Sequence, residues 1–218
     1  MTLRATVFDM DGLLIDSEIL WHQAEVEIFG RLGVPLADDG GRSTKGMYVE
    51  EVVRYWYAHY PWQGAGVAEV TARLLARVGD LVEEVGRLLP GAVRAIDLAS
   101  ERGPVALASS TPQALIERCL GHFGLTERFA TIHSADVEPF GKPHPGVFLT
   151  AAHALGVAAP SCLVFEDSAA GVIAAKAAQM SVVAVPVAED RDQAAFALAD
   201  LVLDSLEDLT SDWLDERF

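Results

Sequence analysis

The chain has 218 residues, 51% of them hydrophobic and 22% charged, which predicts one globular domain or a core domain with a smaller insert. Its 32 acidic and 16 basic side chains give a formal net charge of −16. This surplus of negative charge argues against binding to nucleic acid or to an anionic membrane, since both are bound through basic patches.

The sequence carries no sign of export or of a disulfide framework. Residues 3–8 lack the basic start and cleavage site of a signal peptide, and no apolar run is long enough to cross a bilayer. Cys119 and Cys162 lie in apolar stretches and are expected to be buried free thiols. We expect a cytoplasmic protein and, because no coiled-coil pattern is present, a monomer.

The first predicted strand covers residues 5–8 and runs directly into two carboxylates, Asp9 and Asp11, followed by Gly12. Acidic side chains two residues apart at the end of a leading strand point to the same side of the sheet edge, where α/β sheets bind ligands. One carboxylate there can attack phosphorus while the other protonates the leaving oxygen. On this fragment alone, a calcium-type loop or an Asx turn would explain the pattern as well.

Residues 17–85 interrupt the strand pattern with three predicted helices. The first places Leu20, Ala24, Ile28 and Leu32 on one face, and the others cover about 47–59 and 67–85. We expect this segment to be an all-helical domain, inserted into a core formed by residues 1–16 and 86–218.

Strands and helices alternate beyond the insert. Further strands are predicted at residues 105–108, 130–132, 163–165, 182–185 and 201–203. Helices are predicted after Thr111, as an N-cap before Pro112, near Pro145 and after Ser168. The expected fold is α/β, a Rossmann-like doubly wound parallel sheet core with an inserted all-helical cap domain.

Three more groups of polar residues follow the later strands. Ser109 and Ser110 could hold phosphate oxygens beside a helix N-terminus, and Lys142 could neutralise both a nucleophile and a phosphate. Glu166 and Asp167, with no basic neighbour, could bind Mg²⁺. Each has a plainer explanation: a helix cap for the serines, a solvated surface position for the lysine, and capping of the following helix by Asp167 or Ser168 for the last motif.

The complete set, in this order, resembles the haloacid dehalogenase superfamily, which consists mostly of phosphatases, over essentially the whole chain. The resemblance is to the β-phosphoglucomutase-like branch, with a helical cap after the first motif. The matching residues are Phe8-Asp9-Met10-Asp11-Gly12-Leu13-Leu14-Ile15-Asp16-Ser17-Glu18, Gly141-Lys142-Pro143-His144-Pro145 and Phe165-Glu166-Asp167-Ser168 with Gly171.

This resemblance implies a role for each motif. Asp9 would be the nucleophile, forming an aspartyl-phosphate, and also a ligand of Mg²⁺. Asp11 would be the general acid and then the base, with its backbone carbonyl as a second metal ligand. Ser109 and the N–H of Ser110 would bind the transferring phosphoryl group.

The two remaining motifs would supply charge compensation. Lys142 would order the nucleophile and the phosphate. Asp167 would ligate the metal directly, and Glu166 either directly or through water. Because Asp11 and the metal ligands are present, the chain is expected to be a phosphatase rather than a dehalogenase.

Two departures separate the chain from the mutases of this branch. Trp21 stands where the mutases carry a cap histidine, and residues 46–50 lack their arginine. Hydrolysis is therefore favoured, with a sugar phosphomutase and a non-catalytic binding module on the same fold as the alternatives.

The substrate is expected to be a small phosphorylated metabolite. The chain is similar to bacterial phosphatases of 2-deoxyglucose-6-phosphate and hexitol phosphates, which implies a sugar or sugar-alcohol phosphate. Residues 43–46 form the candidate specificity loop, in which Lys45 is either a substrate contact or plain surface. The aromatic-rich residues 56–64 are expected to pack within the cap, and Gly146 to weaken the capping of the helix it starts.

Overall fold

A wholly parallel, six-stranded sheet forms the core of the protein. The computed structural model describes residues 2–36 and 48–217. Within them the strands are β1 (Ala5–Phe8), β2 (Val105–Ser109), β3 (Thr131–Ser134), β4 (Cys162–Glu166), β5 (Ser181–Ala184) and β6 (Leu201–Val202). Their order is β3-β2-β1-β4-β5-β6, so the winding reverses beside β1. The predicted doubly wound sheet is confirmed, and every strand end lies within two residues of its predicted position.

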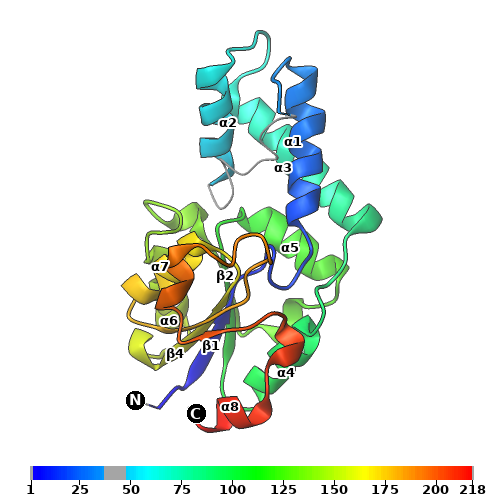
Figure 1. Ribbon diagram of the computed structural model, residues 1–218. Helices are drawn as coiled ribbons and strands as arrows, with labels where there is room; N and C mark the ends of the chain where they lie inside the picture. Colours follow the sequence, from blue (N-terminus) through cyan, green and yellow to red (C-terminus); the bar gives the residue numbers. More distant parts are fainter. Residues whose placement is uncertain (1, 37–47, 218) are drawn as a thin grey trace.

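Helices cover both faces of this sheet because the strand side chains alternate between two apolar clusters. Val7, Ala106 and Val164 pack with α6 (Gly146–Ala154) and α7 (Ala169–Ala177). Phe8 and Leu107 belong to the opposite cluster, with α4 (Ala92–Ser100), α5 (Gln113–His122) and α8 (Ser211–Asp215). Figure 1 shows the sheet between these two helical layers. The helices α4 and α8 were not among the predicted elements.

The segment after β1 folds into three helices, α1 (Glu18–Arg31), α2 (Val49–His59) and α3 (Val67–Val85), called the α1–α3 bundle below. The bundle stands beyond one end of the sheet (Figure 1). Its centre is aromatic: the Phe29 ring lies 6.3 Å from that of Trp56 and 6.0 Å from that of Trp62. The interpretation of residues 56–64 as a packing element therefore holds for both tryptophans, whereas Tyr57 and Tyr60 are exposed.

The chain enters and leaves the bundle at one place. The Asp16 N–H donates to the Arg87 carbonyl at 2.9 Å, and the Leu89 N–H donates to the Leu14 carbonyl at 2.9 Å. The two connecting segments thus run side by side in opposite directions.

Side chains join the bundle to the core at two further points. The guanidinium of Arg118, on α5, donates to Glu83 at 2.6 and 2.8 Å and to Asp80 at 2.8 Å, both on α3. The Tyr48 hydroxyl, just before α2, donates to Asp136 at 2.5 Å, in the turn after β3. The bundle is therefore held over the sheet edge from two sides.

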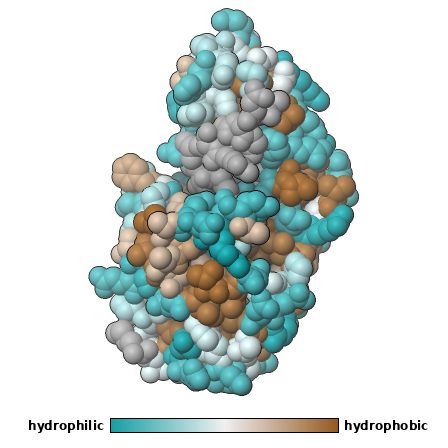
Figure 2. Space-filling model, viewed as in Figure 1, coloured by the Kyte–Doolittle hydropathy of each residue, from teal (hydrophilic) through white to brown (hydrophobic). Residues whose placement is uncertain are grey.

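The surface and the cysteines agree with the composition. Figure 2 shows a mostly hydrophilic face on which the hydrophobic side chains form separate patches. Among the helices of the described residues, none combines the length and apolar character needed to cross a bilayer. Cys119 and Cys162 are buried and free, and burial raises their thiol pKa values to about 12 and about 11.

Candidate active site

The pairing of β1 with β4 brings two acidic side chains together at the sheet edge. Phe8 and Phe165 are direct partners in register, and their rings stack 4.7 Å apart with 5° between their planes. Since strand side chains alternate between faces, Asp9 and Glu166 turn together to the opposite face. The Asp9 N–H donates to the Phe165 carbonyl at 3.0 Å, which extends the ladder by one residue. Both carboxylates are buried, with Asp9 6% exposed and Glu166 fully enclosed.

Lys142 lies between these two carboxylates. Its Nζ donates to Asp9 Oδ1 at 2.5 Å, to Glu166 Oε1 at 2.6 Å and to the Ala108 carbonyl at 3.1 Å. The side chain is only 4% exposed, and the Phe148 ring centroid lies 4.8 Å from Nζ. The explanation of Lys142 as a solvated surface residue is therefore wrong.

Burial and charge set the protonation of this group. Burial raises the pKa of the Asp9 carboxyl above its usual range, and repulsion from Glu166 and Asp11 adds to the effect, although Lys142 opposes it. Burial opposes the charge of Lys142, yet Asp9 and Glu166 raise its pKa above the usual range. The Lys142 ammonium therefore stays charged. Its single positive charge is shared between the carboxylates of Asp9 and Glu166.

The acidic cluster has the chemistry of a metal site. Asp9, Glu166 and Asp167 each offer an oxygen, and these atoms lie within 4.8 Å of one another. Two glycines make room for them: a Cβ at Gly12 would lie 2.4 Å from Asp167 Oδ2, and one at Gly171 would lie 1.8 Å from Glu166 Oε1. Gly12 also has a φ of +71°, which side chains with a Cβ rarely adopt. A buried, all-oxygen set fits a hard divalent cation.

The end of β2 supplies hydroxyls to the same edge. Ser109 Oγ accepts the Thr111 N–H at 3.1 Å. Ser110 Oγ is buried and has no hydrogen-bond partner among the described residues, and it lies 3.9 Å from where a Cβ would stand at Gly141, next to Lys142. Buried hydroxyls normally form a hydrogen bond, so this one is suited to bind an oxygen atom of a ligand.

Three donors from two parts of the fold hold Asp11. Ser17 Oγ donates to its Oδ1 at 2.6 Å and Trp21 Nε1 to the same oxygen at 3.1 Å, both at or near the start of α1. Thr111 Oγ1 donates to Oδ2 at 2.6 Å from the core. The prediction that Thr111 caps α5 is therefore wrong: the N-cap is Pro112, and the threonine hydroxyl faces the site.

The donation by Trp21 was missed in the sequence. Ser17 and Trp21 are four residues apart, which places them on one face of a helix. That spacing, next to an acidic motif, was the available signal.

Other predicted residues fall as follows. Ser168 caps α7, since its Oγ accepts the Gly171 N–H at 3.0 Å, and it also donates to Glu166 Oε2 at 2.9 Å. The N-cap of α6 is Pro145, which makes no side-chain cap, as expected for a weakly capped helix, and the Gly146 N–H donates to His144 Nδ1 at 3.1 Å. Lys45 and the loop 43–46 lie outside the described residues.

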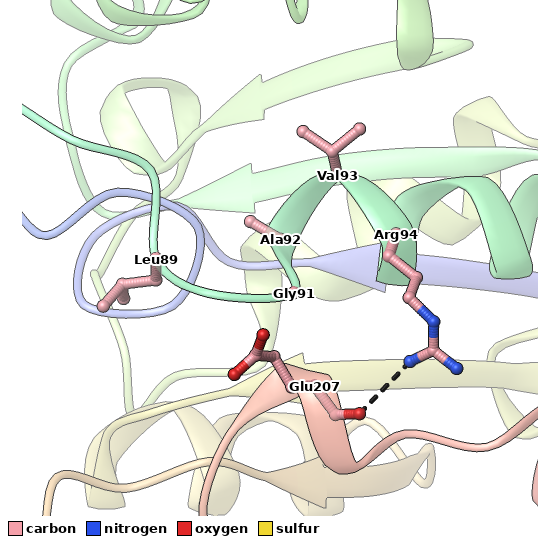
Figure 3. Close-up of a pocket in the computed structure, with 6 residues that line it drawn as sticks. All are labelled: Leu89, Gly91, Ala92, Val93, Arg94 and Glu207. Carbon is pink, nitrogen blue, oxygen red and sulfur yellow. Dashed lines mark hydrogen bonds between the residues drawn. The ribbon is translucent and has the colours of Figure 1, made fainter.

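A separate hollow of about 460 Å³ lies at the start of α4. Figure 3 shows its lining, which is formed by Leu89, Gly91, Ala92, Val93, Arg94 and Glu207. The Arg94 guanidinium donates to the carbonyls of Glu207 at 3.2 Å and Leu209 at 2.8 Å, so it is already engaged by the backbone. None of the lining residues belongs to the Asp9 cluster, and the cluster remains the candidate active site.

Comparisons with known proteins show the family of the chain. A model of the haloacid dehalogenase-like hydrolase family matches residues 3–179. Hexitol phosphatase B of Escherichia coli is 44% identical over 211 residues, which are 96% of this chain and 95% of the relative.

Two solved structures share the architecture. CbbY from Rhodobacter sphaeroides, in complex with phosphate, aligns with a TM-score of 0.84 and 29% identity over 95% of this chain and 96% of its own. β-Phosphoglucomutase from Clostridium difficile aligns with a TM-score of 0.83 and 25% identity over 99% and 96%.

Proposed function

Because the chain belongs to the haloacid dehalogenase-like hydrolase family and is a phosphoric monoester hydrolase, we propose that it dephosphorylates a small sugar or sugar-alcohol phosphate, with Asp9 as the nucleophile. The observation that carries this proposal is the buried Lys142 ammonium, 2.5 Å from Asp9 and 2.6 Å from Glu166. This ammonium holds the Asp9 carboxylate in place at the edge of the sheet, where it can attack phosphorus.

The reaction would take place in two displacements. In the first, an Asp9 oxygen bonds to phosphorus, the bond from phosphorus to the leaving oxygen breaks, and Asp11 passes its proton to that oxygen. In the second, a water attacks phosphorus, Asp11 takes a proton from the water, and the Asp9–phosphorus bond breaks. Ser109, the Ser110 N–H and Lys142 would hold the oxygens that do not react.

Mg²⁺ is the proposed cofactor. Asp9, Asp167 and the Asp11 carbonyl would hold it directly. Glu166 would act through water, because Lys142 and Ser168 already occupy both of its oxygens. When bound, the ion stabilises the charge on the phosphoryl oxygens.

The α1–α3 bundle would be the cap, comprising residues 17–85. A cap over the sheet edge excludes water from the aspartyl-phosphate until the alcohol has left, and it selects the alcohol. Lys45, which precedes Tyr48 in the sequence and lies outside the described residues, is proposed as a contact to the substrate.

The substrate class rests on the relative. Hexitol phosphatase B, by its name, acts on hexitol phosphates, and its alignment covers nearly all of both chains. The monomeric state and the cytoplasmic location stay predictions.

Phosphate release tests the proposal. The purified protein with Mg²⁺ should release phosphate from hexitol phosphates, chelation by EDTA should stop the release, and Asp9→Asn should abolish it. Asp97→Asn, on the outer helix α4, is the matched control and should remain active. An Asp9→Asn protein with unchanged turnover would refute the nucleophile.

A sugar phosphomutase is the alternative that the likeness to β-phosphoglucomutase brings forward. Trp21 stands in place of the mutase histidine, and its indole N–H donates a hydrogen bond to Asp11. Incubation with a sugar phosphate and a bisphosphate primer distinguishes the two: isomer conversion faster than phosphate release would make the protein a mutase.

A further inference from the structure

The two oxygens of Asp11 have different neighbours. Oδ1 accepts from Ser17 at 2.6 Å and from the Trp21 indole at 3.1 Å, whereas Oδ2 accepts from Thr111 at 2.6 Å. The three donors come from both sides of the seam between bundle and core. They fix the plane of the carboxyl group as well as its position.

The chemistry of these donors is unequal. The serine and threonine hydroxyls can turn and either donate or accept, but an indole N–H can only donate. An oxygen facing an indole N–H must therefore act as an acceptor. Oδ2, which faces only a hydroxyl that can turn, is the oxygen that can carry a proton towards a substrate.

The packing of Trp21 helps it to hold the Asp11 carboxyl group in this orientation. It is half-buried on α1, and its ring packs against the apolar cluster shared by the bundle and the core. An indole wedged in this way loses little freedom when its N–H is engaged, in contrast to a long flexible donor.

From these contacts we propose that Trp21 is a positioning residue for the general acid: its N–H holds Oδ1 of Asp11 so that Oδ2 faces the leaving oxygen. This inference rests on the proposed role of Asp11. Trp21, which stands where the mutases carry a histidine, would thus contribute to hydrolysis. It would do so through a hydrogen bond, without transferring a proton itself.

The choice of leaving group provides the test. Sorbitol phosphate releases an alcohol that must be protonated as it leaves, whereas 4-nitrophenyl phosphate releases a stable phenolate that needs no proton. Trp21→Phe removes only the N–H and part of the ring. The quantity to compare is kcat/KM, because it reports the first displacement and leaves out the hydrolysis of the aspartyl-phosphate, which is the same for both substrates. The kcat/KM of the variant with sorbitol phosphate should fall at least about tenfold, and by no more than the roughly 10²–10⁴-fold that general acid catalysis contributes. Its kcat/KM with 4-nitrophenyl phosphate should stay close to that of the wild type.

Two variants frame this result. Asp11→Asn should show the same split between substrates, only larger. Trp62→Phe is the matched control, since Trp62 is another tryptophan of the inserted segment, is buried, and donates its indole N–H, at 3.0 Å, to the Ala65 carbonyl instead of to Asp11. It should show no split between the substrates.

Other results would overturn the proposal. Equal losses on both substrates would make Trp21 a structural residue only, and an unchanged Trp21→Phe enzyme would remove its role altogether. If wild-type protein releases phosphate from neither substrate, the proposed function itself fails. If it is active but Asp11→Asn shows no split, the acid role of Asp11 fails, and the role of Trp21 with it.

A second substitution guards against a folding defect. Benzothienylalanine at position 21 keeps the two fused rings and replaces only the N–H by sulfur. This variant should reproduce the split with an unchanged melting temperature. Wild-type turnover of sorbitol phosphate by it would refute the hydrogen bond as the cause.

Discussion

At the scale of single residues, the candidate site is distinguished by its buried charged side chains. Asp9, Glu166 and Asp167 are nearly inaccessible, and Lys142 is the cation between the first two. Removing one partner of a buried pair costs far more than the pair itself contributes, because the other charge is left without compensation. Lys142 should therefore determine stability as well as activity.

Lys142→Met is predicted to lower the free energy of unfolding by about 3 kcal/mol in EDTA, since two carboxylates then face each other without a cation. Mg²⁺ should stabilise this variant more than the wild type because it supplies the missing positive charge. Urea unfolding with EDTA and with Mg²⁺ measures both effects.

The control is the exposed pair of Lys176 and Asp200, whose side chains are 32% and 43% exposed at a distance of 3.0 Å. Lys176→Met should change the free energy of unfolding by less than about 1 kcal/mol. Equal effects of the two substitutions would show that the burial of Lys142 carries no energetic weight.

The sequence allowed the motif residues to be predicted, but not their hydrogen bonds. Asp9 and Asp167 stand out because each directly follows a strand, and Lys142 because it lies between Gly141 and Pro143 in a recognisable motif. The donation by Trp21 and Thr111 to Asp11 depends on how a helix of the insert meets a core loop, which no local pattern records. The carboxyl group's orientation is thus a tertiary property.

At the scale of elements, one ion pair joins two helices of the α1–α3 bundle. Arg77, on α3, donates to Glu27, on α1, through Nε at 2.7 Å and Nη2 at 3.2 Å, a two-point contact. The hydrogen bond from Arg77 lowers the pKa of Glu27 to about 2. The contribution of this pair to stability must therefore depend on pH.

Glu27→Gln is predicted to destabilise the protein at neutral pH by up to about 1 kcal/mol, a value limited by the partial exposure of the pair. Because the pKa is lowered in the folded state, the contribution is present above the ordinary value of 4.5 and is lost as the pH falls towards about 2. Urea unfolding of wild type and variant across this range measures the difference.

Glu69→Gln is the control, since Glu69 pairs with Arg73 within α3 and both side chains are more than half exposed. It should change the free energy of unfolding by only a few tenths of a kcal/mol. A difference between Glu27→Gln and wild type that persists unchanged at low pH would contradict the prediction.

The elements themselves were mostly predictable. Apolar runs located all six strands, and four-residue spacing located the first helix of the insert. The short α8 and the true cap of α5 escaped prediction because tertiary contacts decide both: Leu214 is buried in the core cluster, and Thr111 is drawn to Asp11.

At the scale of the whole molecule, the position of the bundle depends on a charged contact to the core. Arg118 on α5 contacts Glu83, Asp80 and the Ala76 carbonyl on α3. Gly79 permits this approach, since a Cβ there would lie 2.2 Å from the guanidinium. The contact joins two helices that are far apart in the sequence.

Arg118→Met is predicted to weaken this joint by about 1 kcal/mol, because the contact is a network of partly exposed charges. Amides of α3 that open with the bundle should then exchange hydrogen about fivefold faster. Hydrogen exchange followed by mass spectrometry measures this. Arg73→Met, which breaks a pair within α3 alone, should leave the exchange near wild type. Equal exchange in both variants would show that Arg118 does not hold the bundle.

The antiparallel ribbon at the foot of the bundle makes the protein modular. Backbone hydrogen bonds join Leu14 to Leu89 and Asp16 to Arg87. The two places at which the chain enters and leaves the bundle therefore lie within one hydrogen bond of each other. Any foreign unit whose own ends lie that close could be grafted there without stretching β1 or α4. One contiguous stretch of the gene can therefore be exchanged to make chimeras that keep the parallel sheet with its acidic cluster and carry a different unit above it.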